Sequence, residues 1–166
     1  MKITVREGNI GLVPSDALIT TVNSAGLWFG AIDRLIHQYA GSGPHTILSG
    51  NLRHMRESSA ISVPAEGSAF KNVVFVIDDL HEDLWVPIYN ALDVADFHRH
   101  KVVTIPTVRF SVMLGIKEKT IEQYLTQFTK GIIEWTTDNG DPSIEEIKIV
   151  VYKDQNMLRN LTTIFV

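Results

Sequence analysis

The chain has 166 residues, of which 45% are hydrophobic and 20% are charged, and its formal net charge is −4. This length fits one domain with a sizeable core, and the acidic balance disfavours general nucleic-acid binding, which usually requires a basic excess. The sequence contains no cysteine, which excludes disulfides, thiolate metal sites and a cysteine nucleophile.

The first residues of the sequence predict a strand and bear on the cellular location. Residues 2–6 alternate apolar and polar side chains, which is typical of a peripheral strand. No signal-peptide core precedes this strand, and no apolar run approaches the roughly 18 residues that a membrane helix needs. We therefore expect a cytoplasmic protein with no membrane partner.

The stretch 17–41 contains a buried strand, a loop of small residues and an amphipathic helix. The strand is predicted over 17–22, and the helix begins near Ala31 and stops near Gly41. Its apolar face carries Ile32, Leu35, Ile36 and Tyr39. A strand, a small-residue loop and a helix in this order can bind phosphate, because the first N–H groups of the helix are unpaired and its dipole is positive there.

The rest of the chain predicts four more strands and four more helices. The strands are expected at 60–64, 71–77, 101–108 and 144–152, and the helices at 45–56, 83–97, 117–136 and from about 155 onward. The acidic residues from Asp78 to Asp83 suit the start of the helix that follows them. His98 and His100 are interpreted as basic residues at a helix end rather than metal ligands, because no carboxylate lies at ligand spacing.

Short segments of this sequence resemble the signature of the macrodomain family. They read VNSA at 22–25, GAID at 30–33, IH at 36–37 and AG at 40–41, where the family has roughly V-N-A-A-N, a glycine run, V-D-G, A-I-H and A-G. Pro106 also matches a proline of the family, within I-P-T-V-R-F-S-V-M-L-G. The resemblance covers essentially the whole chain and implies one domain over 1–166, a three-layer α/β/α sandwich with a mixed sheet of about six strands.

The resemblance also implies a ligand. Macrodomains bind ADP-ribose and related metabolites, and several branches hydrolyse ADP-ribosyl linkages. The implied partner is ADP-ribose or an ADP-ribosylated macromolecule, and neither a cofactor nor a metal ion is implied. Two alternatives remain beside a hydrolase: a reader of ADP-ribose that does not catalyse, and a diverged macro fold that acts through protein contacts.

The implied ligand-binding residues come from four segments. Asn9 stands where the family has an aspartate that accepts a hydrogen bond from the adenine amino group, and its side-chain carbonyl can also accept. Tyr152 falls where some members stack an aromatic ring on adenine. The full set is Asn9, Ile10, Asn23, Gly26, Gly30, Ala31, Ile32, Val108, Arg109, Phe110, Ser111, Val112, Met113 and Tyr152.

Three further positions depart from the family pattern. Gly26 replaces an asparagine that hydrogen-bonds the distal ribose, and Ser111 replaces a glycine of the phosphate-binding loop. Met113 replaces an aromatic residue that packs on the distal ribose. The side-chain amide of that asparagine helps to orient the ribose, and Gly26 lacks it. We therefore expect hydrolysis to be weak or absent.

Asp33 is the candidate catalytic residue. It matches the aspartate that orients the attacking water in hydrolytic members. Read from the residues alone, Asp33 can also be an acid in the first helical turn, stabilised by the dipole, or a salt-bridge partner of Arg34. His37, one turn further along, is interpreted as a packed structural histidine rather than a base.

Overall fold

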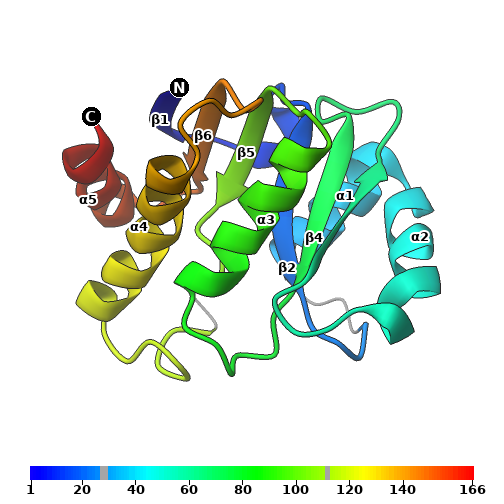
Figure 1. The fold of residues 1–166 in the computed structure, drawn as a ribbon, viewed down its shortest axis with the longest axis horizontal. Coiled ribbons are helices and arrows are strands. Elements are labelled where there is room, and N and C mark those ends of the chain that lie inside the picture. Colours follow the sequence, from blue (N-terminus) through cyan, green and yellow to red (C-terminus); the bar gives the residue numbers. More distant parts are fainter. Residues whose placement is uncertain (27–29, 111–112) are drawn as a thin grey trace.

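A computed structural model of the chain describes residues 1–26, 30–110 and 113–166. Its six strands form one sheet in the order β1-β6-β5-β2-β4-β3, with helices on both faces (Figure 1). The strands are β1 (Lys2–Glu7), β2 (Ala17–Val22), β3 (Ala60–Pro64), β4 (Asn72–Ile77), β5 (Val102–Pro106) and β6 (Glu146–Val151). The helices are α1 (Ala31–Ala40), α2 (Gly43–Asn51), α3 (Trp85–Phe97), α4 (Ile121–Asp138) and α5 (Gln155–Phe165). The predicted mixed, six-stranded sheet is confirmed.

All neighbouring strands pair in parallel except β3, which runs antiparallel to β4. The central strand β2 lies between β5 and β4, so that Leu18 faces Val73 on one side and Thr104 on the other. Because five strands are parallel, their carboxyl ends meet at one edge of the sheet. Ligands of open α/β sheets bind at that edge.

Two apolar cores lie on opposite faces of the sheet. Ile19 belongs to the core formed with α3, α4 and α5, whereas its neighbour Leu18 belongs to the core formed with α1 and α2. Successive side chains of a strand point to opposite faces, so a strand covered on both sides is apolar throughout. The run Asn72–Ile77 of β4 meets this requirement, because Val73 to Ile77 are all buried.

Helix α4 begins later than its sequence pattern predicts. The predicted helix covered 117–136, but Thr120 is the N-cap, and its hydroxyl accepts a hydrogen bond from the N–H of Gln123 at 3.1 Å. Threonine is a favoured N-cap residue because its oxygen pairs with one of the unpaired first N–H groups. Glu118 therefore precedes the helix, and its side chain is free to reach a different part of the molecule.

The end of α3 also differs from the prediction. His98 is exposed and caps the helix, whereas His100 is buried, and its Nε2 lies 2.9 Å from Oγ of Ser62 on β3. Burial, and secondarily the charge of His98, lower the pKa of His100, and these effects outweigh the opposing influence of Asp16. His100 is therefore a packed histidine and not a solvated helix-end residue.

We expect the buried His100 to make the protein less stable in mild acid. A pKa below its unfolded value of 6.5 means that the unfolded chain takes up the proton more readily. The contribution of His100 is complete above that value and is lost as the pH falls through the folded pKa. His100→Gln keeps a hydrogen-bonding side chain beside Ser62 and does not titrate. Urea unfolding at about pH 7 and pH 5 should show that the free energy of unfolding falls less between these two pH values in the variant than in the wild type. An equal fall in both proteins would contradict the prediction.

Among the residues that the structure describes, no helix combines the length and the apolar character needed to cross a membrane.

Candidate functional site

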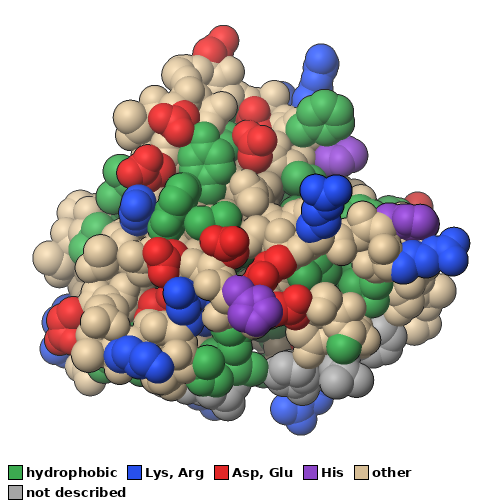
Figure 2. Space-filling view, turned by 60° about the horizontal axis from the view of Figure 1, so that its bottom comes forward, with side chains coloured by type: hydrophobic (Ala, Val, Ile, Leu, Met, Phe, Trp, Pro, Cys, Tyr) green, Lys and Arg blue, Asp and Glu red, His purple; other side chains and the backbone are tan. Residues whose placement is uncertain are grey.

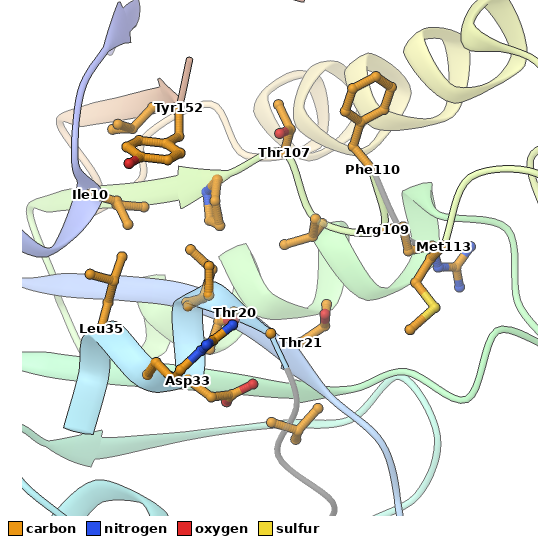
Figure 3. A pocket seen from close by; sticks show the side chains of 18 of the residues that line it. Ile10, Thr20, Thr21, Asp33, Leu35, Thr107, Arg109, Phe110, Met113 and Tyr152 are labelled. Atoms are coloured by element: carbon orange, nitrogen blue, oxygen red, sulfur yellow. The ribbon is translucent and has the colours of Figure 1, made fainter. Parts of the chain in front are cut away.

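A cleft of about 980 Å³ lies at the carboxyl ends of the parallel strands. Its wall includes residues that follow five of the strands: Asn9 after β1, Asn23 after β2, Asp78 after β4, Thr107 after β5 and Tyr152 after β6. The first turn of α1 closes one side (Figure 3). The cleft has the size of a small-molecule site and lies where an α/β sheet binds its ligands.

The structure brings most of the predicted site residues together around this cleft. Those that line it are Asn9, Ile10, Asn23, Gly30, Ala31, Ile32, Asp33, Val108, Arg109, Phe110, Met113 and Tyr152. Gly26 is not among the described residues that line the cleft. The predictions for Ser111 and Val112 fall outside the described part of the chain.

One end of the cleft carries the exposed ring of Tyr152. Its side chain is 63% exposed and stands at the cleft edge in Figure 3, near Ile10. The Nζ of Lys153 lies 5.2 Å from the centre of the Tyr152 ring. An exposed aromatic face at a cleft edge is suited to stack on a base.

Asn9 lies at the same end, held by two hydrogen bonds. Its Oδ1 accepts from the N–H of Gly11 at 2.9 Å, and its Nδ2 donates to Oη of Tyr39 at 3.4 Å. A side-chain carbonyl has two lone pairs, so Oδ1 can accept a second hydrogen bond. Gly11 is required here, because an added Cβ would lie 2.6 Å from the ring of Tyr39. The sequence pattern did not single out Gly11 or its contact with Tyr39.

The start of α1 faces the other part of the cleft. Gly30 is its N-cap, and no side chain caps the helix. Gly30 has a φ of 119°, a conformation that glycine adopts without strain. The first backbone N–H groups of a helix have no intrahelical partner and attract anions. The described residues from Gly30 onward therefore place a helix start without a side-chain cap at the cleft.

Gly26 is turned toward Leu52. Its φ is 70°, and a Cβ added to it would lie 2.6 Å from Cδ1 of Leu52. A side chain at this position would require the flexible end of the Leu52 side chain, which follows α2, to shift. The left-handed backbone at Gly26 favours glycine over a residue with a side chain.

Asp33 is buried at 8% exposure, and its partner is a histidine that the sequence analysis did not single out. Its Oδ1 lies 2.9 Å from Nε2 of His45 on α2, and His45 is fully buried. The His45 ring stacks on His37 at 4.5 Å between centroids and meets Phe75 at 5.0 Å. The predicted salt bridge with Arg34 is replaced by this pair. His37 is exposed and contributes its ring to the stack, which differs from the packed position predicted for it.

The side chain of Arg109 is engaged by two carboxylates of the protein. Its Nε and Nη2 donate to the two oxygens of Asp78 at 2.8 and 2.7 Å, and its Nη1 donates to Glu118 at 3.0 Å. Burial alone would lower the pKa of Arg109, but Asp78 and Glu118 outweigh it and raise the pKa. Arg109 was predicted to bind the ligand, and only its backbone remains available for that role. Phe110 turns its ring to Tyr124 of α4, at 5.1 Å between centroids.

Several cleft residues were missed because only the strand order places them there. Thr20, Thr21, Asp78 and Asp79 line the cleft. The last two were interpreted as the acidic start of a helix, but they follow β4, which pairs with β2. Polar residues directly after a buried strand were the signal that could have found them.

The end of the molecule that carries the cleft has side chains of both charges. Figure 2 views the molecule from the end that carries these loops and shows acidic side chains interspersed with basic and hydrophobic ones. The cations that line the cleft are Arg34, Lys153 and Arg109, and the last is paired with two carboxylates.

Sequence comparison matches the chain to no protein-family model and to no curated protein. Comparison of structures does find proteins of similar fold. The D40A variant of the Oceanobacillus iheyensis macrodomain has a TM-score of 0.79 at 12% identity, over 97% of this chain and 90% of that one. The macro domain of ganglioside induced differentiation associated protein 2 has a TM-score of 0.76 at 14% identity, over 99% and 84%. The Trypanosoma brucei macrodomain in complex with ADP-ribose has a TM-score of 0.75 at 13% identity, over 96% and 67%. This chain therefore has the macrodomain fold.

Proposed function

We propose that this protein recognises ADP-ribose, either free or attached to a macromolecule. The observation that carries the proposal is the arrangement of one cleft, with an exposed Tyr152 ring at one end and the uncapped start of α1 along its side. An aromatic face binds a base, and an open helix N-terminus binds phosphate. The Trypanosoma brucei macrodomain, which has the same fold, is in complex with ADP-ribose.

Two sets of residues would hold two parts of the proposed ligand. Asn9, Ile10 and Tyr152 would hold the adenine, with Oδ1 of Asn9 accepting from its amino group. Gly30, Ala31 and the backbone of the segment 107–110 would hold the diphosphate. The distal ribose would then lie near Asp33, which is part of the cleft wall.

Calorimetric titration with ADP-ribose tests this proposal. We expect one site per chain and much weaker binding of ribose 5-phosphate, which lacks the adenine and one phosphate. A protein that gives no heat and no change in its amide NMR spectrum with ADP-ribose would contradict the proposal. The location in the cytoplasm remains a prediction from the sequence.

Hydrolysis of an ADP-ribosyl linkage is the finer proposal, and Asp33 is the residue that would carry it. Its Oδ1 is held by His45 at 2.9 Å, and its Oδ2 has no protein partner among the described residues. A carboxylate whose orientation is set on one oxygen can hold a water molecule on the other. The same pair also fits a reader that does not catalyse, because a buried contact between Asp33 and His45 can serve packing alone.

We expect Asp33→Ala to separate these two functions. If Asp33 orients the attacking water, the variant should release ADP-ribose from a modified protein or nucleic acid about 10²- to 10⁴-fold more slowly. Its affinity for ADP-ribose should stay close to that of the wild type, because the adenine and diphosphate contacts lie elsewhere.

Asp33→Asn is the matched control for this measurement. It keeps an oxygen beside His45 but removes the carboxylate, so it should also lose turnover while remaining as stable as the wild type. An Asp33→Ala variant with full turnover would contradict the assigned role. A wild type that binds ADP-ribose without turnover would identify a reader.

A further inference from the structure

Two adjacent carboxylates lie between the loops on either side of the cleft. Asp78 and Asp79 directly follow β4, and the N–H of Asp78 donates to the carbonyl of Val22 at 2.7 Å. One oxygen of Asp79, Oδ1, accepts from the backbone N–H of Ser24 at 2.9 Å. The loop that follows β2 is thus attached to Asp79 through its backbone.

Asp78 makes the corresponding attachment to the loop that follows β5. Its two oxygens accept from Nε and Nη2 of Arg109 at 2.8 and 2.7 Å, a paired geometry that fixes the planes of both groups. Its Oδ1 also accepts from the N–H of Leu80 at 3.0 Å. The side chains of Asp78 and Arg109 are 4% and 2% exposed, so water does not compete for this pair.

Arg109 extends the connection to the segment before α4. Its Nη1 donates to both oxygens of Glu118 at 3.0 and 3.1 Å, and its Nη2 donates to the carbonyl of Glu82 at 2.7 Å. Its backbone has a φ of 65°, which a side chain other than glycine rarely adopts. Such a conformation persists where the surrounding contacts determine it, and the contacts of the Arg109 side chain supply this condition.

We propose that Asp78 and Asp79 form a brace that fixes Ser24, just after β2, and Arg109, just after β5, relative to each other, and that this placement determines how tightly the cleft holds a diphosphate. The second part rests on the proposed recognition of ADP-ribose. Asp78 and Asp79 act as positioning residues, because the oxygens described above are occupied by Arg109, Leu80 and Ser24.

The physical reason is preorganisation. A backbone cradle binds an anion well only when its N–H groups are already in place, because ordering a loop on binding costs free energy. In this chain the hydrogen bonds of Asp79 to Ser24 and of Asp78 to Arg109 hold both loops from the same two-residue segment.

Asp79→Ala and Asp79→Asn form the matched pair that tests the brace. Alanine removes the acceptor for Ser24, whereas asparagine keeps an oxygen at the same place and removes only the charge. We expect Asp79→Ala to weaken ADP-ribose binding about three- to tenfold, the effect of one lost hydrogen bond. Asp79→Asn should bind within about twofold of the wild type. Adenosine, which has no phosphate, should bind all three proteins equally, as measured by NMR titration.

Hydrogen exchange of the Ser24 amide gives a readout that needs no ligand. It should be faster in Asp79→Ala than in the wild type and unchanged in Asp79→Asn. Unchanged exchange of the Ser24 amide in Asp79→Ala would overturn the brace. An Asp79→Ala variant that loses as much affinity for adenosine as for ADP-ribose would also overturn it, and so would equal losses of ADP-ribose affinity in the two variants. A wild type that binds no ADP-ribose while Ser24 exchanges as expected would refute the proposed ligand and its dependence on the brace, and would leave the brace itself supported.

Discussion

Replacing Arg109 with methionine should lower the free energy of unfolding by about 3–5 kcal/mol, the cost of breaking a buried ion pair by removing one partner. The side chains of Asp78 and Glu118 are 4% and 5% exposed, and both depend on the Arg109 guanidinium. Without it, two carboxylates would stay buried with no cation beside them. For a chain of this length the midpoint of thermal unfolding should fall by roughly 6–20 °C.

Arg99→Met is the matched control for this experiment. Arg99 also has a left-handed backbone, with a φ of 59° against 65° for Arg109, but it is exposed. Both variants therefore exchange the same side chains on a similar backbone, and only one breaks a buried network. Urea unfolding followed by tryptophan fluorescence reports the difference, because Trp135 is fully buried.

A second variant separates the charge from the packing. Adding Asp78→Asn and Glu118→Gln to Arg109→Met removes the unpaired carboxylates and should recover part of the lost stability. A single Arg109→Met variant that unfolds at the same urea concentration as Arg99→Met would contradict the prediction. It would mean that water reaches the two carboxylates once the arginine is gone.

Replacing Tyr152 with alanine should weaken ADP-ribose binding by about 1–3 kcal/mol, the usual contribution of an aromatic ring that stacks on a base. This corresponds to a roughly five- to 150-fold higher dissociation constant. The ring is 63% exposed and lies at the cleft edge, so its loss should leave the free energy of unfolding nearly unchanged. A change in affinity without a change in stability would identify a binding residue.

Tyr152→Phe provides the control, because it keeps the ring and removes the hydroxyl. It should bind ADP-ribose about as tightly as the wild type if the ring face makes the contact. Calorimetric titration of all three proteins measures the effect. Equal affinity of the wild type and Tyr152→Ala would show that the adenine does not stack there.

The sequence by itself determined the elements of the fold. Burial and periodicity are local properties, so the apolar run of β4 and the amphipathic pattern of α1 were sufficient to predict a strand and a helix. The resemblance then supplied the order of these elements and led to the macrodomain fold, which the structural comparison confirms. It also directed attention to Asn9 and Tyr152, which the structure places at one end of the cleft.

The roles of the charged residues were decided only by the tertiary structure. Asp33 had three interpretations, and its partner proved to be His45, from the next helix. Arg109 was expected to bind a ligand, but the pairing of β2 with β4 and β5 brings Asp78 to its side chain across 31 positions of sequence. Hydrophobic periodicity records which side chains are buried and contains no information about which polar groups meet. Those meetings depend on strand order and on where each strand ends, and both are properties of the folded sheet.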